Sequence, residues 1–485
     1  MSIQTFEPSM ILAILPEILL VVLAGFILAF DAIWKPEVKR SLGWMTAGGL
    51  LLVMVITLLF SRPPDDGRLI FGGMIQQDWL SFAFVLLFLF AAAITALFAM
   101  DMKGVGHKGE FYVLMLVSTL GMCLMASSAD IIMLYLAIET TSIPMYILAG
   151  FMTNDDKSTE SGFKYLLFGA AASTIMLYGF SLLYGFTGQT NIHQIALNFY
   201  DLQFPEIAII GCLLLILVGF GFKISMVPFH FWAPDVYEGA PTPIAGFLST
   251  ASKAAGFVVL LRVLITIFTP SATPEWNNLL AIVAVLTMTI GNVLALAQKN
   301  IKRLLAFSSI AHAGYILIGV VALSQLGITS VVFYLIAYII TNLAAFGIVM
   351  TFSLVVGSDE ISAYSGLSRR KPWLALAMMV AFLSLAGMPP LAGFIAKFFV
   401  FSAAVKVDMI WLAFVGVLNS IVGLYYYLTV LKYVYLFRSD DEDKPLNISR
   451  PYSIALTILI LGIILVGTLF GPWFNLSTTL ASSLF

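Results

Sequence analysis

The sequence predicts an all-α integral membrane protein with about fourteen transmembrane helices. Of its 485 residues, 61% are hydrophobic and only 10% are charged, whereas ordinary soluble domains carry roughly 25% charged residues. The apolar residues fall into runs of about 20, the length that spans a bilayer. The loops between these runs are too short to hold a separate domain. We therefore expect residues 1–485 to form a single polytopic membrane domain.

Composition also limits the classes of function. The net charge of −2 provides no field that would attract nucleic acid. Cys123 and Cys212 lie inside apolar runs and lack the spacing of metal ligands or of a CxxC motif. Both are expected to be small core residues. No haem, iron–sulfur or zinc site is visible in the sequence, so no cofactor is expected in this chain.

The first apolar run, Met10–Phe30, is predicted to be a retained span. Glu7 precedes it, and its basic residues Lys35, Lys39 and Arg40 follow it. A removable signal peptide has the opposite order. Because basic residues mark the cytoplasmic side, this span should end in the cytoplasm.

Fourteen segments are long and apolar enough to cross a bilayer. They are Met10–Phe30, Leu42–Phe60, Trp79–Ala99, Phe111–Ser127, Asp130–Phe151, Glu160–Phe186, Glu206–Val227, Thr242–Phe268, Asn277–Ala297, Leu304–Ala322, Ile328–Val355, Pro372–Ser402, Met409–Phe437 and Tyr452–Trp473. Glu17, Asp130 and Glu206 lie near predicted helix starts, where a carboxylate favours the positive end of the helix dipole.

The distribution of basic residues supports this number of spans. With both termini outside, the predicted cytoplasmic loops hold 15 Lys and Arg residues, and the opposite loops hold 3. A missed or added span would destroy this asymmetry. The cytoplasmic set is Lys35, Lys39, Arg40, Lys103, Lys108, Lys157, Lys299, Lys302, Arg303, Arg369, Arg370, Lys371, Arg438, Lys444 and Arg450; the opposite set is Arg62, Arg68 and Lys406.

The seventh and twelfth spans are predicted to be broken helices. Pro228 and Pro234 interrupt the seventh, and the run GMPPLAG, residues 387–393, interrupts the twelfth. Proline removes a helical hydrogen bond and clashes with the preceding turn. The breaks are five spans apart, and five is odd, so two inverted five-helix repeats are expected, helices 4–8 (about 111–268) and 9–13 (about 277–437). Three N-terminal helices (about 1–110) and a last helix (about 452–475) complete the chain.

Ionisable residues inside the predicted spans are the candidate functional groups. A lysine at the bilayer centre costs about 2.5–3.5 kcal/mol, so several of them require partners, water or a function. Near span ends, Arg262 and Lys432 are instead expected to extend to the membrane interface. The candidates are Glu139, Lys164, Lys223, His230, Lys253, His312 and Lys397.

The chemistry of lysine suits proton transfer at such sites. Desolvation disfavours the charged form of lysine, and a neighbouring carboxylate favours it. A change in the distance between Glu139 and a lysine would therefore load or release a proton. His230 is interpreted either as a relay or as a cap of the broken segment, and His312 either as a relay or as a core histidine.

Three stretches resemble the antiporter-like subunit N of proton-pumping NADH:quinone oxidoreductase, respiratory complex I. They are GFKISMVPFHFWAPDVYEGAPTPIAGFLSTASKAAGF, IKRLLAFSSIAHAGY and LSLAGMPPLAGFIAKFFV. The resemblance covers nearly the whole chain and implies a fourteen-helix fold with inverted repeats. It also implies that Glu139, Lys164, Lys223, Lys253 and Lys397 match the family's buried ionisable residues.

This resemblance implies a proton-translocating subunit without redox chemistry of its own. FMN, iron–sulfur clusters and quinone would belong to partner subunits, among them sister antiporter-like subunits, in an energy-transducing membrane such as the bacterial inner membrane. Protons would reach Lys223, pass Lys253 and His312, and leave from Lys397. The alternatives are a subunit of a multi-subunit Na⁺/H⁺ antiporter and a purely structural scaffold.

Overall fold

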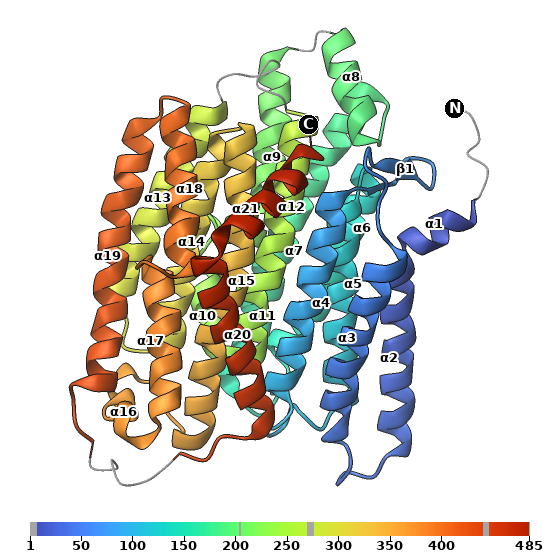
Figure 1. The fold of residues 1–485 in the computed structure, drawn as a ribbon. Helices are drawn as coiled ribbons and strands as arrows, with labels where there is room; N and C mark the ends of the chain where they lie inside the picture. The colour runs from blue at the N-terminus through green and yellow to red at the C-terminus, as the bar shows by residue number, and fades with distance from the viewer. Residues whose placement is uncertain (1–6, 203–204, 269–275, 440–445, 485) are drawn as a thin grey trace.

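The computed structural model is a bundle of long helices, most of them aligned with one axis (Figure 1). It describes residues 7–202, 205–268, 276–439 and 446–484. In this part of the chain, thirteen helices are long and apolar enough to cross a membrane. One further predicted span, Pro372–Ser402, is divided into two shorter helices, Pro372–Ala386 and Ala392–Lys406. The predicted number of fourteen spans is thus confirmed.

The N-terminal helices precede the first repeat and carry a small β-hairpin. In this hairpin Arg68 pairs with Gln77. Directly after it, Asp78 caps the next helix, because its side chain accepts a hydrogen bond from the backbone N–H of Ser81 at 2.8 Å. The elements are α1 (Pro8–Ala13), α2 (Leu15–Ile33), α3 (Ser41–Phe60), β1 (Arg68–Ile70), β2 (Ile75–Gln77) and α4 (Trp79–Ala99).

In the described residues, the first predicted repeat contains five helices of 14 or more residues and three shorter ones. Its eighth span includes a π-helical turn, η1 (Leu248–Ser252), between two α-helical parts. The helices are α5 (Gly109–Ser127), α6 (Ile131–Ala149), α7 (Asp156–Thr187), α8 (Ile192–Leu202), α9 (Glu206–Ile224), α10 (Trp232–Gly239), α11 (Thr242–Phe247) and α12 (Lys253–Thr266).

The second predicted repeat is followed by the last two helices of the chain. A short 3₁₀ turn, η2 (Ile361–Tyr364), and the one-turn helix α16 (Leu367–Arg370) lie in one of its connections. The other helices are α13 (Trp276–Leu296), α14 (Ile301–Val321), α15 (Gln325–Val356), α17 (Pro372–Ala386), α18 (Ala392–Lys406), α19 (Ile410–Tyr435), α20 (Arg450–Thr468) and α21 (Phe470–Ser482).

Both predicted helix breaks are confirmed. Helix α9 is followed by Ser225, which has a φ of 59°, and α17 is followed by Gly387, which has a φ of 87°. Left-handed residues of this kind close helix C-termini. Helix α9 follows α8 at one end of the bundle, whereas α17 follows α16 at the opposite end (Figure 1). The two broken helices thus run in opposite directions, as an inverted repeat requires.

The core of the bundle is formed by α12, α14 and α15. The spans that contain α12 and α14 each include a stretch of 18 residues that is buried throughout, whereas most of α2 faces the outside of the bundle. Helices surrounded by protein can carry polar groups that lipid would not tolerate. Cys123 and Cys212 are buried, as predicted for core residues.

The prediction that Arg262 extends to the membrane interface is wrong. Its side chain is 2% exposed, and its Nη1 lies 2.9 Å from a carboxylate oxygen of the equally buried Asp78. Its Nη2 also donates to the carbonyl oxygen of Ala126 at 2.9 Å. The residue that follows the hairpin therefore supplies a counter-charge inside the bundle, and Arg262 does not need to reach water.

Candidate functional site

Lys223 lies in the last turn of α9, directly before the first break. Its side chain is buried, and its Nζ donates a hydrogen bond to the Oγ of Ser142 on α6 at 2.9 Å. Gly256 of α12 packs against it, because a Cβ atom at this position would lie 3.1 Å from Cγ of Lys223. The glycine thus allows α12 and α9 to approach closely around the lysine stem.

Glu139 lies on α6, one turn before the serine that binds Lys223. Residues three apart share a helix face, so Glu139 and Ser142 are presented toward the same region. The Oγ of Ser173 on α7 donates to the Glu139 carboxylate. The charge of Glu139 acts on Lys223. The structure therefore brings these two predicted residues together around α6.

Lys253 begins α12, immediately after the π-helical turn. Its side chain is 2% exposed, and its Nζ donates to the backbone oxygen of Ser309 on α14 at 3.0 Å and to the hydroxyl of the same residue. The ring of Tyr237 on α10 lies 5.9 Å from this Nζ. Single π-helical turns often occur at functional sites, where they redirect side chains.

His312 lies on α14, one turn after the serine that binds Lys253. Its Nδ1 is 2.7 Å from the hydroxyl of Tyr334 on α15, and its Nε2 is 3.3 Å from the hydroxyl of Tyr427 on α19. Tyr427 also hydrogen bonds with Ser308. Ser308 and Ser309 are adjacent in the chain, so the hydroxyl contacts of His312 and those of Lys253 end on neighbouring residues of α14.

Lys397 lies on α18, just after the second break. Its Nζ donates to the carbonyl oxygen of Ala386 at 3.1 Å, a group freed from helical bonding by the end of α17. The same Nζ lies 4.7 Å from the ring centre of Tyr315 on α14. A cavity of about 10 Å³, lined by His312 and Ser384, lies between the histidine and this break. That volume is near the lower limit for one water molecule.

Two predicted residues form no hydrogen bond or ion pair with the buried lysines Lys223, Lys253 and Lys397 in the described chain. Lys164 is 34% exposed and forms ion pairs of 2.6 Å with Glu160 and with Asp235. His230 is buried in the first break, with its ring 4.4 Å from the ring of Phe231. Neither residue has a hydrogen bond to the buried lysines in the contacts of the described chain.

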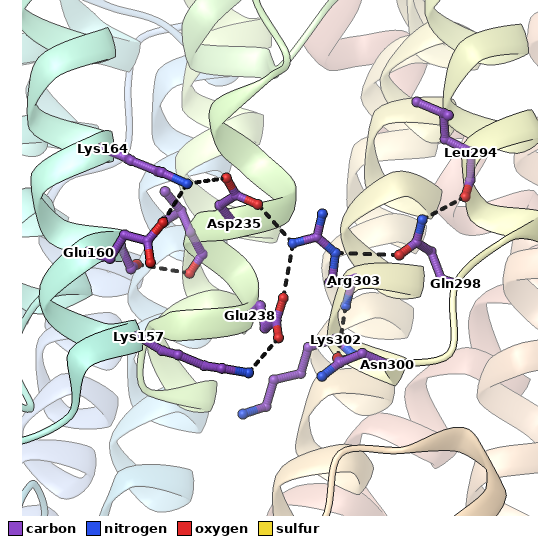
Figure 2. A network of polar contacts seen from close by, with 12 residues as sticks. Lys157, Glu160, Lys164, Asp235, Glu238, Leu294, Gln298, Asn300, Lys302 and Arg303 are labelled. Atoms are coloured by element: carbon purple, nitrogen blue, oxygen red, sulfur yellow. Dashed lines mark hydrogen bonds and ion pairs between the residues drawn. The ribbon is translucent and has the colours of Figure 1, made fainter.

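Lys164 belongs to a group that we call the ion cluster, formed where α7 and α14 begin (Figure 2). The Nη1 of Arg303 on α14 contacts Asp235 at 2.8 Å and Glu238 at 2.9 Å, both on α10. A pocket of about 220 Å³ opens beside these side chains. The cluster consists of Lys157, Glu160, Lys164, Asp235, Glu238 and Arg303.

The two acidic residues of α10, which lies outside the thirteen spans, are held in their ionised form. Burial by itself would raise the pKa of Asp235, but hydrogen bonds and charges from Lys164 and Arg303 lower it below its ordinary value. Burial likewise opposes ionisation of Glu238, and Lys157 and Arg303 lower its pKa. The ion cluster therefore connects the first predicted repeat with the second through full charges.

Sequence reasoning missed the role of Asp235, Glu238 and Arg303. The signal that could have found the acidic pair is their spacing of three in PDVYEG, which places both on one face of a helix. Arg303 was predicted only as a cytoplasmic loop residue, because a sequence does not show which acidic residues a cation will meet.

Residues 128–423 match the protein family described as NADH:quinone oxidoreductase/Mrp antiporter, TM. Curated relatives are similar over almost their whole length. NADH-quinone oxidoreductase subunit N of Heliobacterium modesticaldum is 41% identical over 93% of this chain and 94% of its own. The protein of the same name from Moorella thermoacetica is 41% identical over 97% and 98%.

Solved structures have the same fold. A chain of respiratory complex I from Thermus thermophilus is 33% identical, with a TM-score of 0.80 over 95% of this chain and 98% of its own. A chain of the archaeal membrane-bound sulfane sulfur reductase is 26% identical, with a TM-score of 0.87 over 98% and 97%. A chain of the Mrp complex from Dietzia sp. is 21% identical, with a TM-score of 0.86 over 99% and 98%, and shares the fold.

Proposed function

Because this chain belongs to the family of subunit N of NADH-quinone oxidoreductase, we propose that it moves protons across the membrane for such a complex. Quinone reduction in other subunits would supply the free energy, and this chain would contribute no redox centre. FMN, iron–sulfur clusters and quinone would accordingly be bound by partner subunits, including sister antiporter-like subunits.

The observation that carries this proposal is the series of buried ionisable groups at the centre of the bundle. Lys223, Lys253 and Lys397 are all buried. In the described chain they bind hydroxyl and carbonyl oxygens, and none forms an ion pair with a carboxylate within 4.0 Å. A lysine that only stabilised the fold would be expected to have a carboxylate partner. These contacts support exchange of protons rather than permanent pairing.

The route that we propose begins at Lys223, continues to Lys253 and His312, and ends at Lys397. Between Lys253 and His312 the hydroxyls of Ser309, Ser308 and Tyr427 support lateral transfer. Hydroxyl groups can donate and accept at once, so they suit relays.

Two further predicted residues would act beside this route. Glu139 would control Lys223 electrostatically, since a carboxylate favours the charged form of a nearby lysine. Lys164 would belong to the cytoplasmic end of the route through its contact with Asp235. His230 stays a candidate of the first break.

The sidedness of the chain belongs to the same proposal. Helices α1 and α21 lie toward one end of the bundle, and α16 lies at the other (Figure 1). We assign the α16 end to the cytoplasm because of the excess of basic residues in its loops. Both termini would then lie on the outer side of an energy-transducing membrane.

Isolation of the native complex tests this proposal. An affinity tag on this chain should retain subunits with iron–sulfur clusters and a quinone site, identified by mass spectrometry. In proteoliposomes the complex should couple quinone reduction to acidification of one compartment without requiring Na⁺. Retention of small antiporter subunits alone, with sodium-dependent exchange, would instead establish the Na⁺/H⁺ antiporter alternative.

A further inference from the structure

A small cavity lies between the first helices and the hairpin, apart from the buried lysines. It has a volume of about 30 Å³ and is bordered by α2, α3, α4, α5 and β2. About two water molecules fit into such a volume. The polar groups around it are Glu17, Thr57, Ser61, Gln76, Gln77, Ser81 and Ser127.

Two oxygen atoms at this cavity are buried without a hydrogen bond from any described residue. They are Oε2 of Glu17, whose residue is 8% exposed, and Oγ of Ser61, whose residue is 5% exposed. A buried polar group without a partner destabilises the fold, and an ionised group without one destabilises it more. Buried oxygens in native proteins therefore have a partner in most cases, which can be a bound water or ion.

The other hydroxyl groups at the cavity have used their protons elsewhere. Thr57 donates to the carbonyl oxygen of Val53 at 2.8 Å, and Ser127 donates to that of Cys123 at 3.2 Å. A hydroxyl has one proton and two lone pairs. These two side chains can consequently offer only lone pairs to the cavity.

No described cation neutralises Glu17. Arg262 is paired with Asp78. The other basic side chain at the hairpin is Arg68, which donates to Gln77 and Ser9. The cavity thus combines a buried carboxylate with several lone pairs, and it lacks a positive charge from the described chain.

We propose that this cavity binds one small monovalent cation, with Glu17 as its charged ligand. The cation is either a proton, carried by the carboxyl group and exchanged through cavity water, or a sodium ion. An isolated buried carboxylate takes up such a charge because its ionised form is poorly solvated. Hard cations prefer oxygen ligands, and oxygens are what the cavity offers.

Few titratable groups of the described residues lie near Glu17. Helix α5 contributes Cys123, on which the charge of Glu17 acts. Helix α8 contributes His193, whose Nε2 lies 3.2 Å from Oε1 of Gln76 in the hairpin. Asp78, the residue before α4, is paired with Arg262. Among the described residues, Thr57 of α3 and Ser61, which directly follows this helix, bring hydroxyl groups to the lining and no titratable group.

The test is thermal unfolding of the purified complex, with this chain carrying Glu17→Gln. Sodium is titrated against choline at constant ionic strength, and pH is varied in a separate series. Glu206→Gln serves as the control, because Glu206 also lies in the first turn of a helix but is exposed. If sodium binds, the melting midpoint of the wild type rises with sodium and that of Glu17→Gln does not.

If a proton binds, the sodium titration and the pH series give a different result. The wild type then loses stability as pH rises and shows no sodium dependence, whereas Glu17→Gln loses this part of the pH dependence. In both cases Glu206→Gln follows the wild type. Parallel behaviour of Glu17→Gln and wild type in both series would overturn the proposal.

A milder variant covers the case in which Glu17→Gln does not assemble. Ser61→Ala leaves the carboxyl group in place and removes one unpartnered oxygen. It should change, by severalfold, the concentration of sodium ions or of protons at which half of the effect on the melting midpoint is reached. An unchanged half-effect point in Ser61→Ala would count against the site.

Discussion

Replacing Arg303 by glutamine is expected to weaken the connection between the two repeats. This residue lies on α14, and its guanidinium binds Asp235 and Glu238 on α10. Glutamine can hydrogen bond but carries no charge. The neighbouring Lys302 is a suitable control, because it pairs with Asp359 at 2.9 Å and has no ion pair with α10 in the described chain.

The size of the effect follows from the exposure of the partners. Hydrogen bonds to charged groups contribute about 1.5–3 kcal/mol when buried, and exposed ion pairs contribute about 0–1 kcal/mol. About a third of Arg303 and of Asp235 is exposed, and Glu238 is more buried. After solvent screening, we expect the two contacts together to contribute about 1–2 kcal/mol.

The pH dependence has a defined sign. The folded-state pKa values of Asp235 and Glu238 are lowered, so their contribution to stability is fully present above the unfolded-state values. These values are about 3.9 for Asp and 4.3 for Glu. The stability difference between wild type and Arg303→Gln should therefore stay constant from neutral pH down to about 5 and diminish below about 4.

A double-mutant cycle gives the clearest measurement. The melting midpoints of Arg303→Gln, Glu238→Gln and the double variant should reveal a coupling of about 0.5–1 kcal/mol. The cycle between Lys302→Gln and Glu238→Gln should be additive. Additivity of the Arg303 and Glu238 variants, or a stability difference that grows as pH falls, would refute the assignment.

Three further changes test other contacts. Asp78→Asn leaves the buried Arg262 unpaired and should lower the free energy of unfolding by about 3–5 kcal/mol. A melting midpoint within a degree of wild type would contradict this. Replacement of both residues by apolar ones should recover most of the lost stability. Gly387→Ala places a Cβ 3.0 Å from Cδ of Lys397 at a φ of 87°, so it should cost roughly 1–3 kcal/mol in thermal unfolding; an unchanged midpoint means that the backbone relaxes. Tyr427→Phe removes the hydroxyl between Ser308 and His312 and should reduce protons pumped per electron while costing only about 0.5–1.5 kcal/mol; full pumping excludes this hydroxyl from the route.

The broken helices and the buried lysines could be predicted because both leave a local signature. Proline and glycine interrupt an apolar run, and a charge inside such a run is conspicuous. The partners of the lysines left no such mark. Ser142 and Tyr427 are ordinary residues of apolar helices, and their roles depend on which helices pack together.

Positions near span ends were harder to predict. Lys164 falls within the predicted span Glu160–Phe186, but α7 begins at Asp156. Eight residues of helix place Lys164 only about 12 Å from that start, where it meets the charges of α10. Arg262 was misplaced for a different reason, since its partner Asp78 directly follows a hairpin of two three-residue strands. Strands so short have no apolar periodicity that a sequence could reveal.

The ratio of protons pumped to electrons transferred tests the central claim most directly. It would be measured in proteoliposomes that contain the whole complex, with Lys223→Ala in this chain and with Lys406→Ala, an exposed lysine, as the control. The account predicts a lower ratio for Lys223→Ala, with quinone reduction retained, and a normal ratio for Lys406→Ala. An unchanged ratio for Lys223→Ala in a fully assembled complex would contradict proton transfer through the buried lysines.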